Sequence, residues 1–461
     1  MNIFQTLWEL IFKRKPNAER PVSQDMQTAL EKWRTMYEIK TGDHQLELPA
    51  GISSEFARLM LAESEISVEE ENQRAEFVGE QMQHFFESFA EKAETACALG
   101  SMAFKPYVSG GKIIVDMVRA DRYMPTVFDA DGNVTAAVFM ARKNVGKVYY
   151  TRLEFHSWDA AGQKYTVDNE CYRSIGVDTL GTPCSLSDVD GWEMLREHQE
   201  IKNITAPLFA VFRVPSYNRI DMDSAVGVSV FANAVGLIDQ ANELWRKIMW
   251  EYDATEAAVD ASMDIFDTLK AKQKNKKSSL PRNKDRLFRK FDFGTDSDIT
   301  KIMQIYSPAI RDTSYFNGFN HILQRIEFNV GLAYGTISEP QEMEKTAEEI
   351  RTSKQRSFVH VAAMQKALEA ALNDLAYAMD VYTTLYQLAP SGECTLSCNW
   401  GDSVLEDADK EFQRRLQMCN ARILKPEYVV SYALGITPEK ALEDYIPDQT
   451  DDGGLFSGGV I

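Results

Sequence analysis

The chain has 461 residues, of which 44% are hydrophobic and 11% aromatic, so it can form two or three domains with large cores and is not a disordered protein. Its formal net charge of −19 at pH 7 excludes a protein coated with basic surface for nucleic acid, because acidic surface repels phosphate. Any DNA that the protein handles is expected to be held locally or merely surrounded.

The chain opens with an amphipathic stretch and continues with helical periodicity. Residues 1–15, MNIFQTLWELIFKRK, place their basic residues after the apolar run, and about ten apolar positions are too few to span a bilayer. An amphipathic helix is favoured there over a membrane anchor. Residues 24–98 are predicted to be helical, and the periodic stretch 77–100 stops at Gly100, a residue suited to a helix C-cap.

The sequence pattern changes after Gly100 from helical periodicity to short β-rich runs. Residues 101–215 consist of short runs rich in β-branched and aromatic residues, separated by Asp-Gly and Gly-Lys turns. This pattern predicts an antiparallel β-rich unit carried on the N-terminal helices. The sequence VSGGKI at 108–113 lacks the spacing of a phosphate-binding loop and is predicted to be a hairpin turn.

Two further helices are predicted, over 226–254 and 311–334, and they are expected to pack antiparallel. Each carries one apolar stripe at steps of three or four, formed by Phe231, Ala234, Ile238, Ala241, Trp245, Ile248 and Tyr252 in the first and by Tyr315, Phe319, Ile322, Ile326 and Val330 in the second. The segment 255–310 between them contains β-like pieces such as RLFRKFDF. The pair therefore resembles a stalk with a tip.

A basic run lies within that tip, at residues 270–290. It holds one acid, Asp285, and ten basic residues: Lys270, Lys272, Lys274, Lys276, Lys277, Arg282, Lys284, Arg286, Arg289 and Lys290. Three interpretations stay open, namely docking of a protein partner, contact with DNA, and an ordinary solvated loop.

The next segment is a short acidic loop followed by an unusually long helix. Residues 335–345 contain Pro340 and are predicted to form an exposed loop. Thr346 and Glu349 form a capping box, Thr-x-x-Glu, at the start of a helix over 346–389. A helix of about 40 residues would be near 60 Å long. Its buried face is predicted to hold Val361, Gln365, Leu368, Leu372, Leu375, Met379, Tyr382 and Tyr386.

The remaining chain is predicted to be small elements and a tail. A β-like piece at 392–404 precedes two short helices, at 407–424 and 438–446, the second with Pro438 at its first position. The Gly- and Asp-rich end has the composition of a disordered tail.

No catalytic or metal-binding constellation is found. The chain lacks G-x-x-x-x-G-K-[ST], H-E-x-x-H, G-x-S-x-G and G-x-G-x-x-G. Its six cysteines lack zinc-site spacing and are interpreted as free buried thiols. We therefore expect no enzyme activity, no cofactor and no metal.

Five stretches in sequence order carry a resemblance to a known family. They are ACALGSMAFKPYVSGGKIIVDMVRADRYMPTVFDADGNV (96–134), YYTRLEFHSW (149–158), PSYNRIDMDSAVGVSVFANAVGLIDQANELW (215–245), PQEMEKTAEEIRTSKQRSF (340–358) and NWGDSVLEDADKEFQRRLQMCNARILKPEYVVSYALGITPEKALEDY (399–445). Over roughly residues 25–448 the chain resembles the portal proteins of tailed double-stranded DNA bacteriophages, in the branch typical of phages of Gram-positive hosts.

The resemblance implies an α+β subunit with the portal-protein fold. Laid on this sequence, that fold has a wing at 1–225, stem helices at 226–254 and 311–334, and a clip at 255–310. A channel loop at 335–345, a long helix at 346–389 leading to the crown, and the crown with the C-terminal tail at 390–461 complete it. The clip of this chain is unusually rich in lysine, so no specific clip contacts are transferred to it.

The resemblance also implies partners and a location. Portals are rings, usually of twelve subunits, at one capsid vertex of the virion, and they are assembled in the host cytoplasm. Double-stranded DNA passes through the ring. The terminase large subunit, a head-completion or adaptor protein, and the major capsid and scaffolding proteins contact it. The alternative function is that of another capsid-associated minor structural protein without a DNA channel, and an enzyme with an unrecognised site is a third.

The implied DNA-facing residues lie in the channel loop. They are Glu339, Gln341, Glu342, Glu344 and Lys345, with an acidic balance. An acidic lining repels phosphate and would let DNA slide, whereas a basic sleeve would hold it. The alternative is that these glutamates only keep a surface loop soluble.

Overall fold

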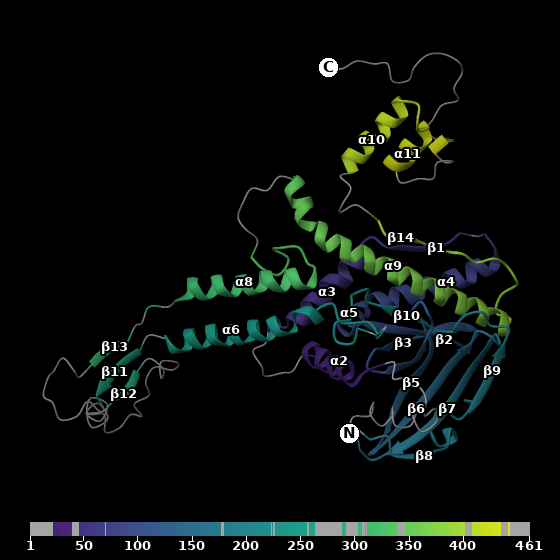
Figure 1. The fold of residues 1–461 in the computed structure, drawn as a ribbon, viewed down its shortest axis with the longest axis horizontal. Coiled ribbons are helices and arrows are strands. Elements are labelled where there is room, and N and C mark those ends of the chain that lie inside the picture. The colour runs from purple at the N-terminus through teal and green to yellow at the C-terminus, as the bar shows by residue number, and fades with distance from the viewer. Residues whose placement is uncertain are drawn as a thin grey trace, which may run out of the picture.

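The structure is a computed structural model. It describes residues 22–38, 46–69, 71–176, 179–222, 224, 226–255, 258–262, 288–291, 303–306, 309, 311–339, 347–401, 408–434 and 441–442. Mixed helices and mainly antiparallel sheets confirm the α+β class (Figure 1). Among these residues no helix is long and apolar enough to cross a membrane.

The N-terminal part is helical, as predicted, but it is interrupted. Its helices are α2 (Gln24–Tyr37), α3 (Leu48–Leu61), α4 (Gln73–Ala90) and α5 (Ala93–Leu99). Gly100 caps α5 in the left-handed conformation, at φ 86°, as predicted. The prediction of continuous helical character over 24–98 is wrong at strand β1 (Glu65–Val68), which pairs antiparallel with β14 (Leu396–Asn399). A pairing partner so distant in sequence leaves no local periodic signal.

The β-rich unit forms two antiparallel sheets, which confirms the prediction for residues 101–215. In the first sheet β2 (Ser101–Ser109) lies between β10 (Ala210–Arg213) and β3 (Lys112–Arg119). The hairpin at Gly110 and Gly111 joins β2 to β3, and both glycines have positive φ. The second sheet has the order β4 (Tyr123–Phe128), β5 (Val134–Val145), β6 (Val148–Asp159), β7 (Lys164–Ser174) and β8 (Thr182–Cys184), with β9 (His198–Lys202) also paired to β7.

Two antiparallel helices project from this body, as predicted (Figure 1). They are α6 (Val235–Ala254) and α8 (Asp312–Val330). The rings of Trp245 and Phe319 lie 5.6 Å apart between them, and Arg311 donates two hydrogen bonds to the carboxylate of Glu251. Apolar stripes therefore form the contact between the two helices, in agreement with the sequence periodicity.

The first of these helices begins later than Val226, the predicted start. Residues 226–231 carry no helix, a short 3-10 turn covers Ala232–Ala234, and α6 starts at Val235. This stretch is held by α5 instead: Val230 N donates to Cys97 O. A Cβ on Gly227 would lie only 2.1 Å from Gly100 O, so two backbones meet where only glycine fits. The second helix ends at Gly331, with φ 87°.

The outer end of the helix pair carries a small sheet. It is formed by β11 (Ala258–Ser262), β12 (Phe288–Phe291) and β13 (Met303–Tyr306), with β11 in the centre. The pairing of β11 with β12 is parallel, and that of β11 with β13 is antiparallel. The β character predicted for RLFRKFDF is confirmed at β12.

The long helix is confirmed as α9 (Ala347–Leu385), with 39 residues. At a rise of 1.5 Å per residue it is about 58 Å long. It crosses the first sheet and packs on α3 and α4 (Figure 1). Its predicted face is buried at Val361, Leu368, Leu372, Leu375 and Met379, whereas Tyr386 lies past the helix end and is half exposed. The predicted cap residue Thr346 lies outside the described residues.

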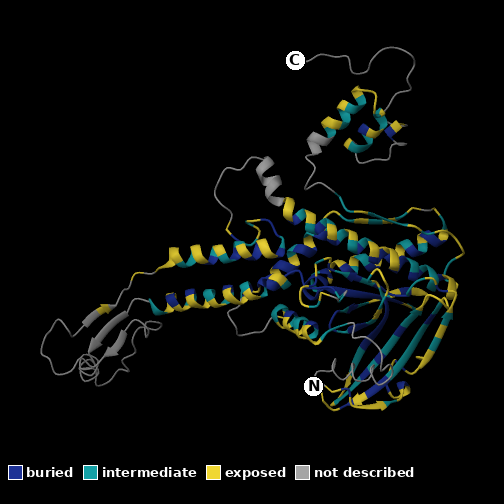
Figure 2. Cartoon of the chain, viewed as in Figure 1, coloured by how far each residue is buried: buried dark blue, intermediate teal, exposed yellow. Residues whose placement is uncertain are grey.

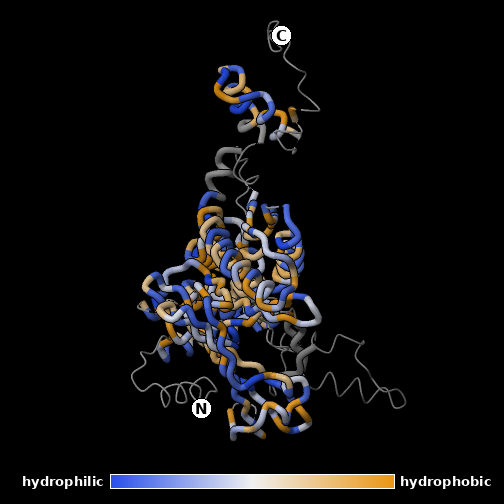
Figure 3. Tube along the Cα trace, turned by 90° about the vertical axis from the view of Figure 1, so that its right-hand side faces the viewer, coloured by the Kyte–Doolittle hydropathy of each residue, from blue (hydrophilic) through white to orange (hydrophobic). Residues whose placement is uncertain are grey.

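The C-terminal elements are partly as predicted. Helix α10 (Ala408–Asn420) confirms the first short helix, while only Ala441 and Leu442 of the second are described, and they are helical. Helix α11 (Pro426–Leu434) was not predicted, although Pro426 at its first position is a start signal. In Figures 1 and 3, α10 and α11 pack against each other and stand apart from the body.

Candidate functional site

Of the ten basic residues in the run 270–290, two lie in the described part of the chain. Arg289 and Lys290 are in β12, in register with Asp260 and Ala261 of β11. The other eight, Lys270, Lys272, Lys274, Lys276, Lys277, Arg282, Lys284 and Arg286, lie outside the described residues, so the three interpretations of the run stay predictions. The two that are described sit at the end of the projecting helix pair (Figure 1).

The chain between α8 and α9 begins as an ordered turn. Residues 331–339 are described, and Glu339 is exposed directly after Ser338, which is buried. Two hydrogen bonds tie this turn to both helices: Glu339 N donates to Asn320 Oδ1 of α8 at 2.9 Å, and Ala333 N donates to Ser357 Oγ of α9 at 2.7 Å. Gln341, Glu342, Glu344 and Lys345 lie outside the described residues.

The projecting helix pair exposes large apolar side chains. Trp250 on α6 is 67% exposed, and Tyr252 and Phe328 are also exposed. Figure 2 shows exposed positions along both helices of the pair. Tyr334 and Val359, near the junction with α9, are exposed as well. An exposed tryptophan on a projecting helix is typical of a protein interface, because tryptophan is enriched at interfaces relative to the rest of the surface.

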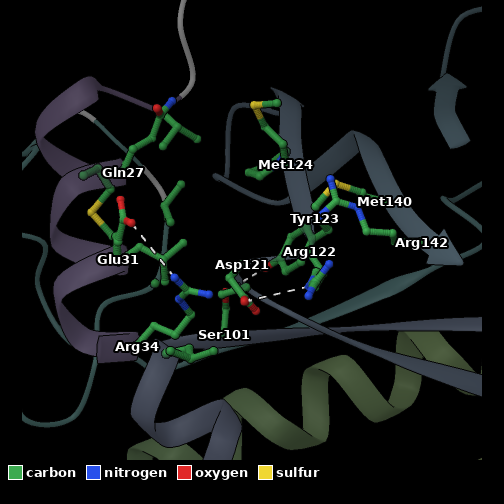
Figure 4. A pocket seen from close by; sticks show the side chains of 18 residues that line it. Gln27, Glu31, Arg34, Ser101, Asp121, Arg122, Tyr123, Met124, Met140 and Arg142 are labelled. Atoms are coloured by element: carbon green, nitrogen blue, oxygen red, sulfur yellow. Dashed lines mark hydrogen bonds and ion pairs between the residues drawn. The ribbon is translucent and has the colours of Figure 1, made fainter. Parts of the chain in front are cut away.

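A cavity of about 450 Å³ lies between α2 and the start of β4 (Figure 4). Two carboxylates line it, and both contact arginines: Glu31 lies 4.0 Å from Arg34, and Asp121 lies 2.7 Å from Arg119 and 3.9 Å from Arg122. Both carboxylates of the cavity are therefore engaged by arginine side chains.

A buried cluster of charged residues connects the two sheets, and sequence reasoning missed it. Lys105 of β2 lies 2.5 Å from Glu154 of β6, and Arg152 lies 2.9 Å from the same carboxylate. His156 Nε2 lies 3.4 Å from Glu154, and its Nδ1 lies 2.5 Å from the hydroxyl of Tyr165. Arg152, Glu154 and His156 are every second residue of β6, so their side chains lie on one face of the strand. Three ionisable residues at this spacing were the sequence signal for the cluster.

Neighbouring cations keep the Glu154 carboxylate of this cluster ionised. Burial alone would raise the pKa of Glu154, but His156, 3.4 Å away, and the charges of Lys105 and Arg152 hold it well below its usual range. Burial lowers the pKa of His156, although Glu154 opposes that shift. The cluster thus holds an ionised carboxylate inside the protein and connects β2 to β6.

The cysteines and the possible metal ligands are further candidates for a functional site, beside the charged cluster. All six cysteines are free, and Cys97 and Cys171 are buried, whereas the other four are partly exposed, so the expectation that all are buried is wrong. Within the part of the chain that the structure describes, no group of three or more His, Cys, Asp or Glu residues could hold a metal ion.

A second histidine, the partly buried His360, makes the free energy of unfolding depend on pH. Burial lowers the pKa of His360, which packs against Phe56 at 5.1 Å between ring centres. In the unfolded chain the His360 imidazole binds a proton as the pH drops through 6.5, whereas in the folded chain it stays neutral to a lower pH. The free energy of unfolding therefore falls as the pH drops through 6.5. We expect His360→Leu to flatten the pH dependence of the unfolding free energy between pH 7 and 5, measured by urea titration. Equal slopes for both proteins would contradict this.

Comparison with known proteins identifies a family for this chain. A family model described as phage portal protein, SPP1 Gp6-like, matches residues 57–451. A search of curated proteins finds no match. The family match includes the body from the end of α3 onward, the projecting helix pair, α9, α10 and α11, which is most of the chain. The chain therefore belongs to the SPP1 Gp6-like family of phage portal proteins.

Proposed function

We propose that twelve copies of this chain form a ring at one capsid vertex and that double-stranded DNA passes through its centre during packaging and ejection. The observation that carries the proposal is the projecting antiparallel pair of α6 and α8, which joins an α+β body to a small terminal sheet within a chain of the portal family. Head-to-tail contacts with a closing rotation produce such a ring.

In this proposal the helix pair is the stem and residues 255–310 are the clip. The exposed Trp250, Tyr252 and Phe328 of the stem support a subunit interface, because aromatic side chains are enriched at the centres of interfaces. The clip, with its basic run at 270–290, contacts the terminase large subunit during packaging and a head-completion protein afterwards. The wing and crown contact the capsid and scaffolding proteins.

The loop 335–345 is the proposed channel loop. Its place in the chain supports this role, because it connects the inner end of α8 to the start of α9. Its charged residues, Glu339, Glu342, Glu344 and Lys345, have an acidic balance. An acidic surface around DNA repels phosphate and permits sliding. Glu339, the described member of this set, is exposed at the end of the anchored turn.

Replacing residues 340–345 by a Gly-Ser linker tests the channel role. We expect rings to form as in the unaltered protein, because the linker leaves the turn 331–339 and α9 in place, and we expect packaging by the cognate terminase to fall at least tenfold. Electron microscopy counts the rings, and protection of DNA from nuclease measures packaging. Matched Gly-Ser insertion at 176–178, between β7 and β8, is the control.

The outcomes separate the candidate functions. Intact rings with unchanged packaging would remove the channel role from this loop. Absence of rings for the unaltered protein would favour the alternative, a minor capsid-associated protein without a DNA channel.

A further inference from the structure

A buried carboxylate lies at the base of the proposed channel loop. Glu327 is on the last turn of α8 and is 0% exposed. Its Oε1 accepts hydrogen bonds from Ile337 N at 2.6 Å and Ser338 N at 2.9 Å. Its Oε2 accepts from Ser338 Oγ at 2.8 Å and Gly335 N at 3.3 Å. Four donors of the turn after α8 thus converge on one side chain.

The donors of the turn compensate for the burial of the Glu327 carboxylate. A buried carboxylate is tolerated only when hydrogen-bond donors or cations replace its hydration, and here three backbone amides and a hydroxyl do so. The backbone oxygen of Glu327 also accepts from Gly331 N and Leu332 N, so the same residue ends the helix. With the bonds from Asn320 and Ser357, residues 331–339 are tied at several points to α8 and α9.

We propose that Glu327 is a positioning residue that fixes the base of the channel loop, the described residues 335–339, to α8, so that this base moves with the stem helix as one body. The rest of the loop, after Glu339, then continues from a position that α8 defines. A change in the tilt of α8 would be transmitted to the loop through the four bonds. This inference rests on the proposed channel role of the loop, but the anchor itself does not.

Glu327→Gln isolates the anchor. The two side chains have the same shape, yet one carboxylate oxygen becomes an amide NH₂ that cannot accept. If the amide NH₂ takes the place of Oε1, Ile337 N and Ser338 N lose their acceptor. If it takes the place of Oε2, Gly335 N keeps only its bond to Ser338 Oγ, and the bonds of Ile337 N and Ser338 N are made to a neutral oxygen in place of a charged one. We expect amide hydrogen exchange at residues 335–338 to rise about tenfold or more, because a bond to a charged group contributes at least one tenfold step.

Three further variants serve as a control and as milder or more local tests of the hydrogen-exchange result. Glu243→Gln, on the exposed face of α6 where Glu243 pairs with Lys247, should leave exchange at 335–338 unchanged. Ser338→Ala removes one donor and should produce a smaller rise, which provides a milder test if Glu327→Gln does not assemble. Asn320→Ala should raise exchange at Glu339 and leave Ile337 protected. Unchanged exchange at 335–338 in both Glu327→Gln and Ser338→Ala would overturn the anchor.

Positioning is tested by cross-linking to DNA. A photoreactive amino acid is placed at position 342, packaging is stalled with DNA in the ring, and the yield of cross-links per ring is measured. We expect Glu327→Gln to lower this yield severalfold at equal ring number, and Glu243→Gln to leave it unchanged. Raised exchange with an unchanged yield would overturn the positioning role. No cross-links in otherwise unaltered rings would overturn the channel role of the loop, and the exchange result would still stand for the anchor.

Discussion

Replacing Trp250 with Glu is expected to abolish ring assembly while the single chain stays folded. Trp250 is 67% exposed on α6, whereas Trp245, one turn and a half earlier, makes the contact with Phe319 inside the helix pair. The substitution therefore leaves the contact between the two helices intact. In a ring it would bury an unpaired carboxylate at every subunit contact, and each would cost several kcal/mol.

Mass measurement in solution and electron microscopy check this expectation. Circular dichroism and urea unfolding of the variant should match those of the unaltered chain. Met194→Glu is the matched control, because Met194 is 93% exposed in the body between β8 and β9, away from the helix pair. Rings of Trp250→Glu as abundant as those of the control would place the subunit interface on another face of α6.

Replacing Glu154 with Leu is expected to lower the free energy of unfolding by about 3–5 kcal/mol, the range for breaking a buried ion pair by removing one partner. The side chains of Lys105 and Arg152 are 8% and 13% exposed, and both lie within 3 Å of this carboxylate. Without Glu154, two cations stay buried and lose the partner that they share. Part of the loss is offset because Lys105 also lies 3.7 Å from Asp116.

Urea unfolding of the single chain measures the effect. Glu200→Gln, which breaks the more exposed pair of Glu200 and Lys164, is the control and should change stability little. The double variant Lys105→Met with Glu154→Leu should recover part of the loss, because removing both partners leaves fewer unpaired charges. A loss below about 1 kcal/mol for Glu154→Leu would contradict a stabilising role for the cluster.

Local sequence patterns determined much of this fold. The step of three from Trp245 to Ile248, and the steps of three and four from Phe319 through Ile322 to Ile326, predicted the helix pair, and a similar stripe predicted α9. Short β-rich runs separated by Asp-Gly and Gly-Lys turns predicted the antiparallel sheets. These signals are readable because the period of side chains along a helix or strand depends only on neighbouring residues. The portal family was likewise recognised from segments of sequence.

The tertiary structure decided what depends on residues far apart in the chain. Strand β1 exists because β14, from the other end of the chain, pairs with it. Residues 226–231 leave the helix because Gly227 meets Gly100 backbone to backbone. Glu327 carries no sequence signal, since its partners are four donors on a turn whose shape is set by packing between α8 and α9. Burial and long-range hydrogen bonding give such residues their roles, and one-dimensional periodicity does not encode either.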